Sequence, residues 1–169
     1  PDVMDVFKKR SSIVRDIRNF LSDQDFMEVE TPVLHHIYGG ASARPFTTHH
    51  NELKQDLYLR IALELHLKRL IVGGFERIFE IGRVFRNEGV SFKHNPEYTL
   101  LELYQAYADY HDMMDLTEEL IKNVVSSCCE TLIVNYQEKE IDFSKSWTRI
   151  SMKNAVMEYL SLIHISEPT

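Results

Sequence analysis

The densest group of chemically capable side chains lies in one stretch of the chain, between residues 86 and 104. An arginine and a glutamate begin it, and a histidine and an asparagine follow. Three polar or aromatic residues end it, each separated from the next by two or four positions. A separation by an even number of residues places side chains on one face of a β-strand. The group consists of Arg86, Glu88, His94, Asn95, Tyr98, Glu102 and Tyr104.

These residue types suit a ligand that carries phosphates, a flat ring and a positive charge. The guanidinium of Arg86 can bind phosphate oxygens in bidentate fashion, and His94 can assist it. Tyr98 can stack on a ring, while Glu102 and Tyr104 can enclose an ammonium group. The pattern therefore predicts a site for a nucleotide and a cationic small molecule.

A structural interpretation competes with this one. Glu102 lies between two leucines, where a carboxylate is costly unless a cation or a donor meets it. A salt bridge between Arg86 and Glu102 on paired strands would account for both residues without any ligand. The residue types alone leave both interpretations open.

The candidate residues need a hairpin to position them. Residues 77–86 and 98–108 alternate between apolar and polar side chains, which predicts two strands joined by a long polar loop. Loops of that length are often functional.

The rest of the chain predicts further helices and strands, and no repeat or flexible linker interrupts it. We expect one α+β unit in which a turn at 49–51 precedes the second strand. The expected helices are 3–21, 64–72, 112–128 and 151–160, and the expected strands are 26–30, 57–61, 131–136 and 140–143.

Composition narrows the function classes. The 169 residues include 19 Lys and Arg against 26 Asp and Glu, and the net charge of −7 argues against a stand-alone nucleic-acid-binding surface. No apolar run approaches the length of a membrane helix, so no membrane partner is expected.

The cysteines and histidines indicate neither a disulfide nor a metal site. The only cysteines, Cys128 and Cys129, are adjacent, which favours a reducing, cytoplasmic protein. His49 and His50 lack a third ligand at a recognisable spacing, so we predict no metal site here.

Several long motifs, in consistent order, resemble the catalytic domain of class II lysyl-tRNA synthetases over roughly residues 10–160. Residues 26–32 resemble motif 1, which forms the dimer interface in that family, and residues 40–46 resemble a signature of the lysine enzymes. Residues 79–89 and 94–98 resemble motif 2, and residues 103–110 continue the match. The resemblance implies an antiparallel sheet flanked by helices.

The resemblance also implies roles for the residues of an ATP site. Arg86 would hold the α-phosphate of ATP and the lysine carboxylate, and so stabilise the charge that develops during attack. Glu88 would contact the adenine amino group, His94 would lie at the outer phosphates, and Asn95 would belong to the same ATP site. Tyr98 would stack on adenine, where phenylalanine is more usual in the family.

A lysine site follows from the same resemblance. Gly40 and Glu64 would bind the α-amino group, and Glu102 with Tyr104 would surround the ε-ammonium. Leu63 departs from the family, which usually has proline before the matching glutamate, so we expect a looser entry to the helix.

The resemblance covers only part of a synthetase. The Gly-rich motif 3, the magnesium carboxylates and the anticodon-binding OB domain find no match, so the chain is expected to be an interior fragment. Residues 1–160 would be the N-terminal part of the catalytic domain. Residues 161–169 do not continue the pattern and are expected to be a non-native tail, such as translated adapter sequence.

The implied function is ATP-dependent activation of lysine and its transfer to tRNA(Lys), with Mg²⁺ bound outside this segment and a homodimer formed through motif 1. The isolated chain is expected to be inactive. Two alternatives stay open: a truncated, non-catalytic module for dimerisation or regulation, and a paralog that lysylates translation elongation factor P. Residues 40–46 favour the tRNA-charging branch.

Overall fold

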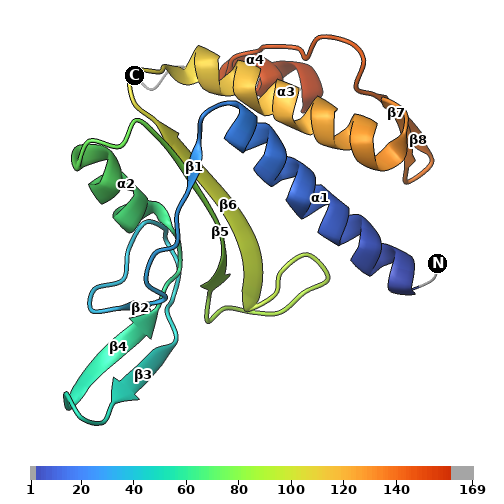
Figure 1. Cartoon of the computed structure of the whole chain (residues 1–169). Helices are drawn as coiled ribbons and strands as arrows, with labels where there is room; N and C mark the ends of the chain where they lie inside the picture. The colour runs from blue at the N-terminus through green and yellow to red at the C-terminus, as the bar shows by residue number, and fades with distance from the viewer. Residues whose placement is uncertain (1–2, 161–169) are drawn as a thin grey trace, which may run out of the picture.

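A hairpin of two long strands forms the centre of the molecule. The computed structural model describes residues 3–160, in which β5 (Arg77–Phe85) and β6 (Glu97–Gln105) pair antiparallel over their whole length (Figure 1). The predicted hairpin is therefore confirmed, with residues 86–96 as its loop.

The third strand of this sheet corrects the expected topology. β1 (Met27–Glu28) pairs with β5 in parallel, in the order β1-β5-β6. The expectation of a purely antiparallel sheet is wrong at this strand. A second sheet and a helix intervene between β1 and β5, and a connection of that length lets the chain return in the same direction.

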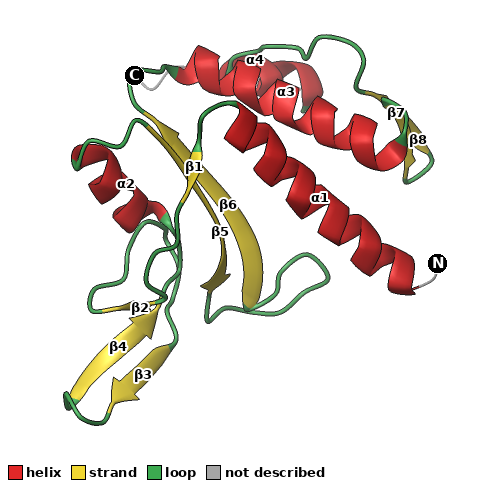
Figure 2. Cartoon of the chain, in the orientation of Figure 1, coloured by secondary structure: helices red, strands yellow, loops and turns green. Residues whose placement is uncertain are grey.

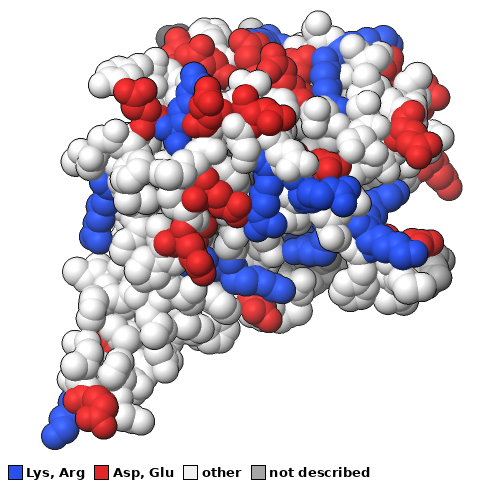
Figure 3. All heavy atoms as spheres, in the orientation of Figure 1, with Lys and Arg blue, Asp and Glu red and all other residues white. Residues whose placement is uncertain are grey.

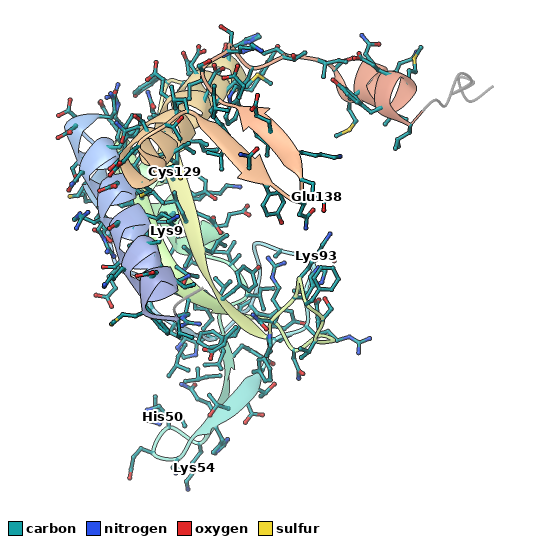
Figure 4. All side chains as sticks on the ribbon, turned by 90° about the vertical axis from the view of Figure 1, so that its right-hand side faces the viewer. Lys9, His50, Lys54, Lys93, Cys129 and Glu138 are labelled. Carbon is teal, nitrogen blue, oxygen red and sulfur yellow. The ribbon has the colours of Figure 1, made fainter. Side chains whose placement is uncertain are left out.

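A second, smaller sheet extends away from the first. It contains β2 (Leu34–His35), β4 (Gln55–Leu59) and β3 (Thr47–His50), all antiparallel, and the turn between β3 and β4 lies at the far end of the projection (Figure 4). The turn predicted at 49–51 is displaced, because His49 and His50 still pair with β4 and the chain turns at 51–54.

The described residues form four helices, α1 (Val3–Asp23), α2 (Glu64–Val72), α3 (Tyr110–Cys129) and α4 (Met152–Tyr159), and β7 (Ile133–Tyr136) with β8 (Lys139–Asp142) forms a small hairpin between the last two. Helix α2 lies on one side of the β5–β6 hairpin, with α1 and α3 on the other (Figure 2). All of these elements were predicted. Helix α3 begins earlier than expected because the carboxylate of Asp109 accepts hydrogen bonds from the first turn. None of the described helices is both long and apolar enough to cross a bilayer.

The two faces of the β5–β6 hairpin pack against different helices. Phe79, with no exposed surface, packs with Leu21 at the end of α1. On the opposite face, Ile78 and Val84 pack with Leu67 of α2. Alternate residues of β5 therefore enter two separate cores, as the period of a strand requires.

Two histidines pack together between β2 and α2. His35 is 4% exposed, and its Nε2 donates to the carbonyl oxygen of Pro32 at 2.9 Å. Its ring meets the ring of His66 at 4.7 Å in an edge-on arrangement. Burial lowers the pKa of both side chains, and the positive charges of Arg60 and Arg69 lower it further.

These lowered pKa values predict a pH-dependent stability. The unfolded chain binds more protons than the folded chain, so the two histidines stabilise the fold above pH 6.5, and this contribution is lost as the pH falls toward their folded pKa values. We expect the free energy of unfolding, measured by urea denaturation, to decrease from about pH 7.5 to about pH 5.5.

His66→Gln should reduce this pH dependence, whereas the control His50→Gln, at an exposed position next to the β3–β4 turn, should retain it. A free energy of unfolding that stays constant across the range would contradict the prediction.

Candidate active site

A pocket of about 260 Å³ lies at the loop end of the β5–β6 hairpin. All five residues predicted for a nucleotide site line it, together with two residues of the same loop. The lining consists of Arg86, Glu88, Gly89, Lys93, His94, Asn95 and Tyr98. The structure thus brings the predicted residues into one cavity, while their roles stay predictions.

Arg86 is fixed from three sides. Its backbone N–H donates to the carbonyl oxygen of Pro96 at 2.7 Å, which closes the end of the hairpin. Its Nε donates to the carbonyl oxygen of Ile61 at 3.3 Å, and its guanidinium lies 5.6 Å from the centre of the Tyr98 ring. Backbone and side-chain contacts therefore hold the cation at one wall of the pocket, above an aromatic face.

The loop between the strands supplies the opposite wall. The backbones of Ser91 and His94 pair with each other, and the Ser91 hydroxyl lies 2.8 Å from Nδ1 of His94. Lys93 also lines the pocket and was missed by the sequence analysis, because a single lysine in a polar loop carries no distinguishing pattern (Figure 4). The pocket therefore has three basic side chains, Arg86, Lys93 and His94, which suit a polyanion.

A carboxylate lies farther along the same face of β6. Glu102 is four residues from Tyr98, or roughly 13 Å along a strand. Its two oxygens accept hydrogen bonds from the backbone N–H of Leu63 and from the hydroxyl of Tyr104, each at 3.0 Å. Burial raises the pKa of Tyr104, and the neighbouring charge of Glu102 raises it further, so the phenol stays protonated and donates.

These contacts decide against the structural interpretation. The salt bridge between Arg86 and Glu102, which the residue types left open, does not form: Arg86 bonds to Ile61 and Glu102 to Leu63 and Tyr104. The reason is that Arg86 follows the last paired residue of β5, whereas Glu102 faces Glu80 in the middle of the ladder. Both of the donors that meet Glu102 are neutral.

Gly40 and Glu64 lie beside this carboxylate. Gly40 has a φ of +87°, and a Cβ there would lie 3.0 Å from the Cβ of Glu64, so glycine permits the close approach of the two segments. The charge of Glu64 also contributes to the raised pKa of Tyr104. Lys68, which the sequence analysis did not predict, forms an ion pair with Glu64 from the next turn of α2.

Leu63 stands at the N-cap of α2 and makes no side-chain cap, and its backbone N–H donates to Glu102. A proline at this position would lack that N–H. The departure from the family pattern is therefore compatible with an ordered entry to the helix, held by the carboxylate.

The described residues contain no group of three or more His, Cys, Asp or Glu side chains that could hold a metal ion. The prediction that magnesium ligands lie outside this segment stays a prediction.

Known proteins match nearly the whole chain. The family model described as tRNA synthetases class II (D, K and N) matches residues 1–166. A relative named lysine–tRNA ligase from Prochlorococcus marinus (strain MIT 9515) is 62% identical over 157 residues, and a relative of the same name from Thermotoga maritima is 58% identical over 167 residues. A third, from Staphylococcus haemolyticus, is 57% identical over 157 residues.

These alignments cover 93% to 99% of the chain but only 31% to 33% of each relative. The chain therefore spans about a third of the length of the curated relatives that it matches. On the family model and these identities, the chain belongs to the class II tRNA synthetases of the aspartate, lysine and asparagine group.

Proposed function

We propose that this chain supplies the ATP-contacting and lysine-contacting part of a lysine–tRNA ligase. Membership of the class II family supports it, as do relatives at 57–62% identity that carry this name. The observation that carries the proposal is the geometry of β6: a basic pocket with an aromatic wall at one end, and a carboxylate with neutral donors farther along. These two sites match the phosphates of ATP and the ammonium group of lysine.

The proposed reaction begins with lysyl-adenylate formation. An oxygen of the lysine carboxylate attacks the α-phosphorus of ATP, the bond to the β-phosphate oxygen breaks, and pyrophosphate leaves with that electron pair. Negative charge develops on the α-phosphate oxygens, where Arg86 would stabilise it. No protein nucleophile is required, so the side chains act by orientation and electrostatics.

The other predicted residues have supporting roles. Glu88 would accept a hydrogen bond from the adenine amino group, Tyr98 would stack on the ring, and His94 with Asn95 would meet the phosphates. Glu64 and the backbone of Gly40 would bind the lysine α-amino group, while Glu102 and Tyr104 would bind the ε-ammonium. Mg²⁺ would be held by residues outside this segment and would neutralise phosphate charge.

The second half-reaction would transfer the lysyl group to tRNA(Lys). The tRNA partner follows from the relatives' names alone and is proposed on that basis. A cytoplasmic location is proposed on the two adjacent free thiols, Cys128 and Cys129.

The role of Arg86 can be tested in a chimera, defined as the full-length Thermotoga maritima relative with its matching segment replaced by residues 3–160 of this chain. Arg86→Ala should lower kcat for lysine-dependent pyrophosphate–ATP exchange by at least about 10²-fold, since one positioned charge is lost from the transition state. The matched control is Arg83→Ala, an exposed arginine three residues earlier on β5. Equal exchange rates in the parent and in Arg86→Ala would contradict the assigned role.

The role of Glu102 predicts a selective change in substrate binding. Glu102→Gln in the same chimera should raise KM for lysine about 10- to 100-fold, because a charge-assisted bond to the ammonium group is lost. KM for ATP should change less than about twofold, because the nucleotide pocket lies at the other end of the strand. Glu119→Gln on the exposed side of α3 serves as control. A parallel rise in both KM values would instead indicate a general distortion.

We also propose that the chain dimerises through α1. Val3, Val6 and Phe7 are 61% to 70% exposed in the first two turns of this helix, which is unusual for three large apolar side chains so close together. Many basic side chains gather over α1 and beside it, so association would also depend on charge (Figure 3).

Sedimentation velocity of the chain tests this proposal. We expect a dimer whose dissociation constant rises at least about tenfold in Phe7→Glu, because a carboxylate would be buried against apolar surface. Tyr136→Glu, at a similarly exposed aromatic residue on β7, is the control and should leave the dimer intact. A monomer at all concentrations would remove the proposal.

A further inference from the structure

A buried ion pair lies behind the candidate site and belongs to none of its predicted residues. Arg60 and Glu80 are 3% and 2% exposed, and Nη1 of Arg60 lies 2.6 Å from Oε1 of Glu80. The other carboxylate oxygen of Glu80 accepts from the Thr31 hydroxyl at 2.6 Å. Neither charge reaches solvent, so the pair takes no part in ligand contact at the surface.

The guanidinium of Arg60 joins its own segment to two others, the strand β5 and the segment at Thr31. Besides Glu80 on β5, its Nη1 donates to the carbonyl oxygen of Thr31 at 3.0 Å, and its Nε donates to the carbonyl oxygen of Arg83 at 2.8 Å. Gly82 leaves the room for this arrangement, because a Cβ there would lie 2.2 Å from Nη2 of Arg60. We refer to Arg60, Glu80, Thr31 and the Arg83 carbonyl oxygen, with the space left by Gly82, as the Arg60 clamp.

The segment that begins at Arg60 meets both halves of the site. The carbonyl oxygen of Ile61, the next residue, accepts a hydrogen bond from Nε of Arg86. The backbone N–H of Leu63, two residues farther along, donates a hydrogen bond to Glu102. The backbone of Arg60 itself is bonded to Val33 and to Phe85 at 2.9 Å each. Residues 60–63 are therefore the shared support of the phosphate-binding arginine and the ammonium-binding carboxylate.

The clamp also gives two neighbouring carboxylates different partners. Glu80 and Glu102 are direct partners in the β5–β6 ladder and lie on the same face of the sheet. Like charges directly opposite each other are destabilising. Arg60 gives Glu80 its counter-charge, while Glu102 receives two neutral donors. The arrangement leaves the charge of Glu102 for a cation from outside.

We propose that Arg60 is a positioning residue that fixes residues 60–63 against β5 and reserves Glu102 for the substrate's ammonium group. This inference rests on the proposed lysine activation and adds a buried residue to it. Lysine cannot replace Arg60 in this role, because an ammonium group lacks the planar fork that reaches Thr31, Glu80 and Arg83 together.

The test compares Arg60→Lys and Gly82→Ala in the chimera with the parent, in pyrophosphate–ATP exchange well below the unfolding temperature of each. Gly82→Ala keeps every charge, but its Cβ would lie 2.2 Å from Nη2 of Arg60 and 3.1 Å from Oε1 of Glu80, so it displaces the ion pair and chiefly the guanidinium. We expect both variants to lower kcat/KM for lysine by about 10- to 100-fold per folded molecule, with a raised KM for lysine, because small displacements of positioned groups have effects of this size. Arg83→Lys is the matched control, since its exposed side chain is outside the clamp.

The outcomes separate the two proposals. If Arg60→Lys and Gly82→Ala unfold at lower temperature but keep the parent's KM and kcat per folded molecule, Arg60 only stabilises the fold and the inference is overturned. If Arg60→Lys does not fold, the KM and kcat of Gly82→Ala decide alone. If the parent chimera activates no lysine, the proposed function fails and the inference with it.

Discussion

The antiparallel ladder between β5 and β6 is the constraint on which the site depends. Nine consecutive residue pairs, from Arg77 with Gln105 to Phe85 with Glu97, fix which side chains share a face. A shift of one residue would turn every side chain of one strand to the opposite face. Because both faces pack against helices, through Phe79 on one side and Val84 on the other, such a shift would bury polar groups and expose two cores at once.

This register places two functions along one strand. Tyr98 lies at the loop end of the hairpin, where the loop supplies basic side chains, and Glu102 lies farther along β6, where α2 begins. The distance between them is that of an extended backbone, which side-chain motion cannot change much. A rigid strand therefore sets the spacing between the groups proposed to bind phosphate and ammonium, as positioned catalysis requires.

Much of this could be predicted from local patterns. The bounds of α2 at Glu64–Val72 were predicted from its acidic first residue and the glycines that follow it, and the hairpin from alternation alone. Contacts between distant segments could not be predicted. Arg60 is 20 residues from Glu80 and 29 from Thr31, and nothing near Arg60 indicates that it is buried. Whether Arg86 pairs with Glu102 could likewise not be decided, since alternation along each strand does not give the register between them.

Stability alone does not account for a buried ion pair. Removing two charges from water costs several kcal/mol per ion, and apolar replacements of similar volume are often equally stable. What an apolar pair cannot provide is direction: the Arg60 guanidinium meets Thr31, Glu80 and Arg83 at fixed angles, and Gly82 is required to admit it. Of two carboxylates that face each other across the ladder, one is thereby neutralised inside the fold and the other is left with neutral donors. That asymmetry, more than the presence of acidic residues on the strand, is what suits Glu102 to the cation-binding role proposed for it.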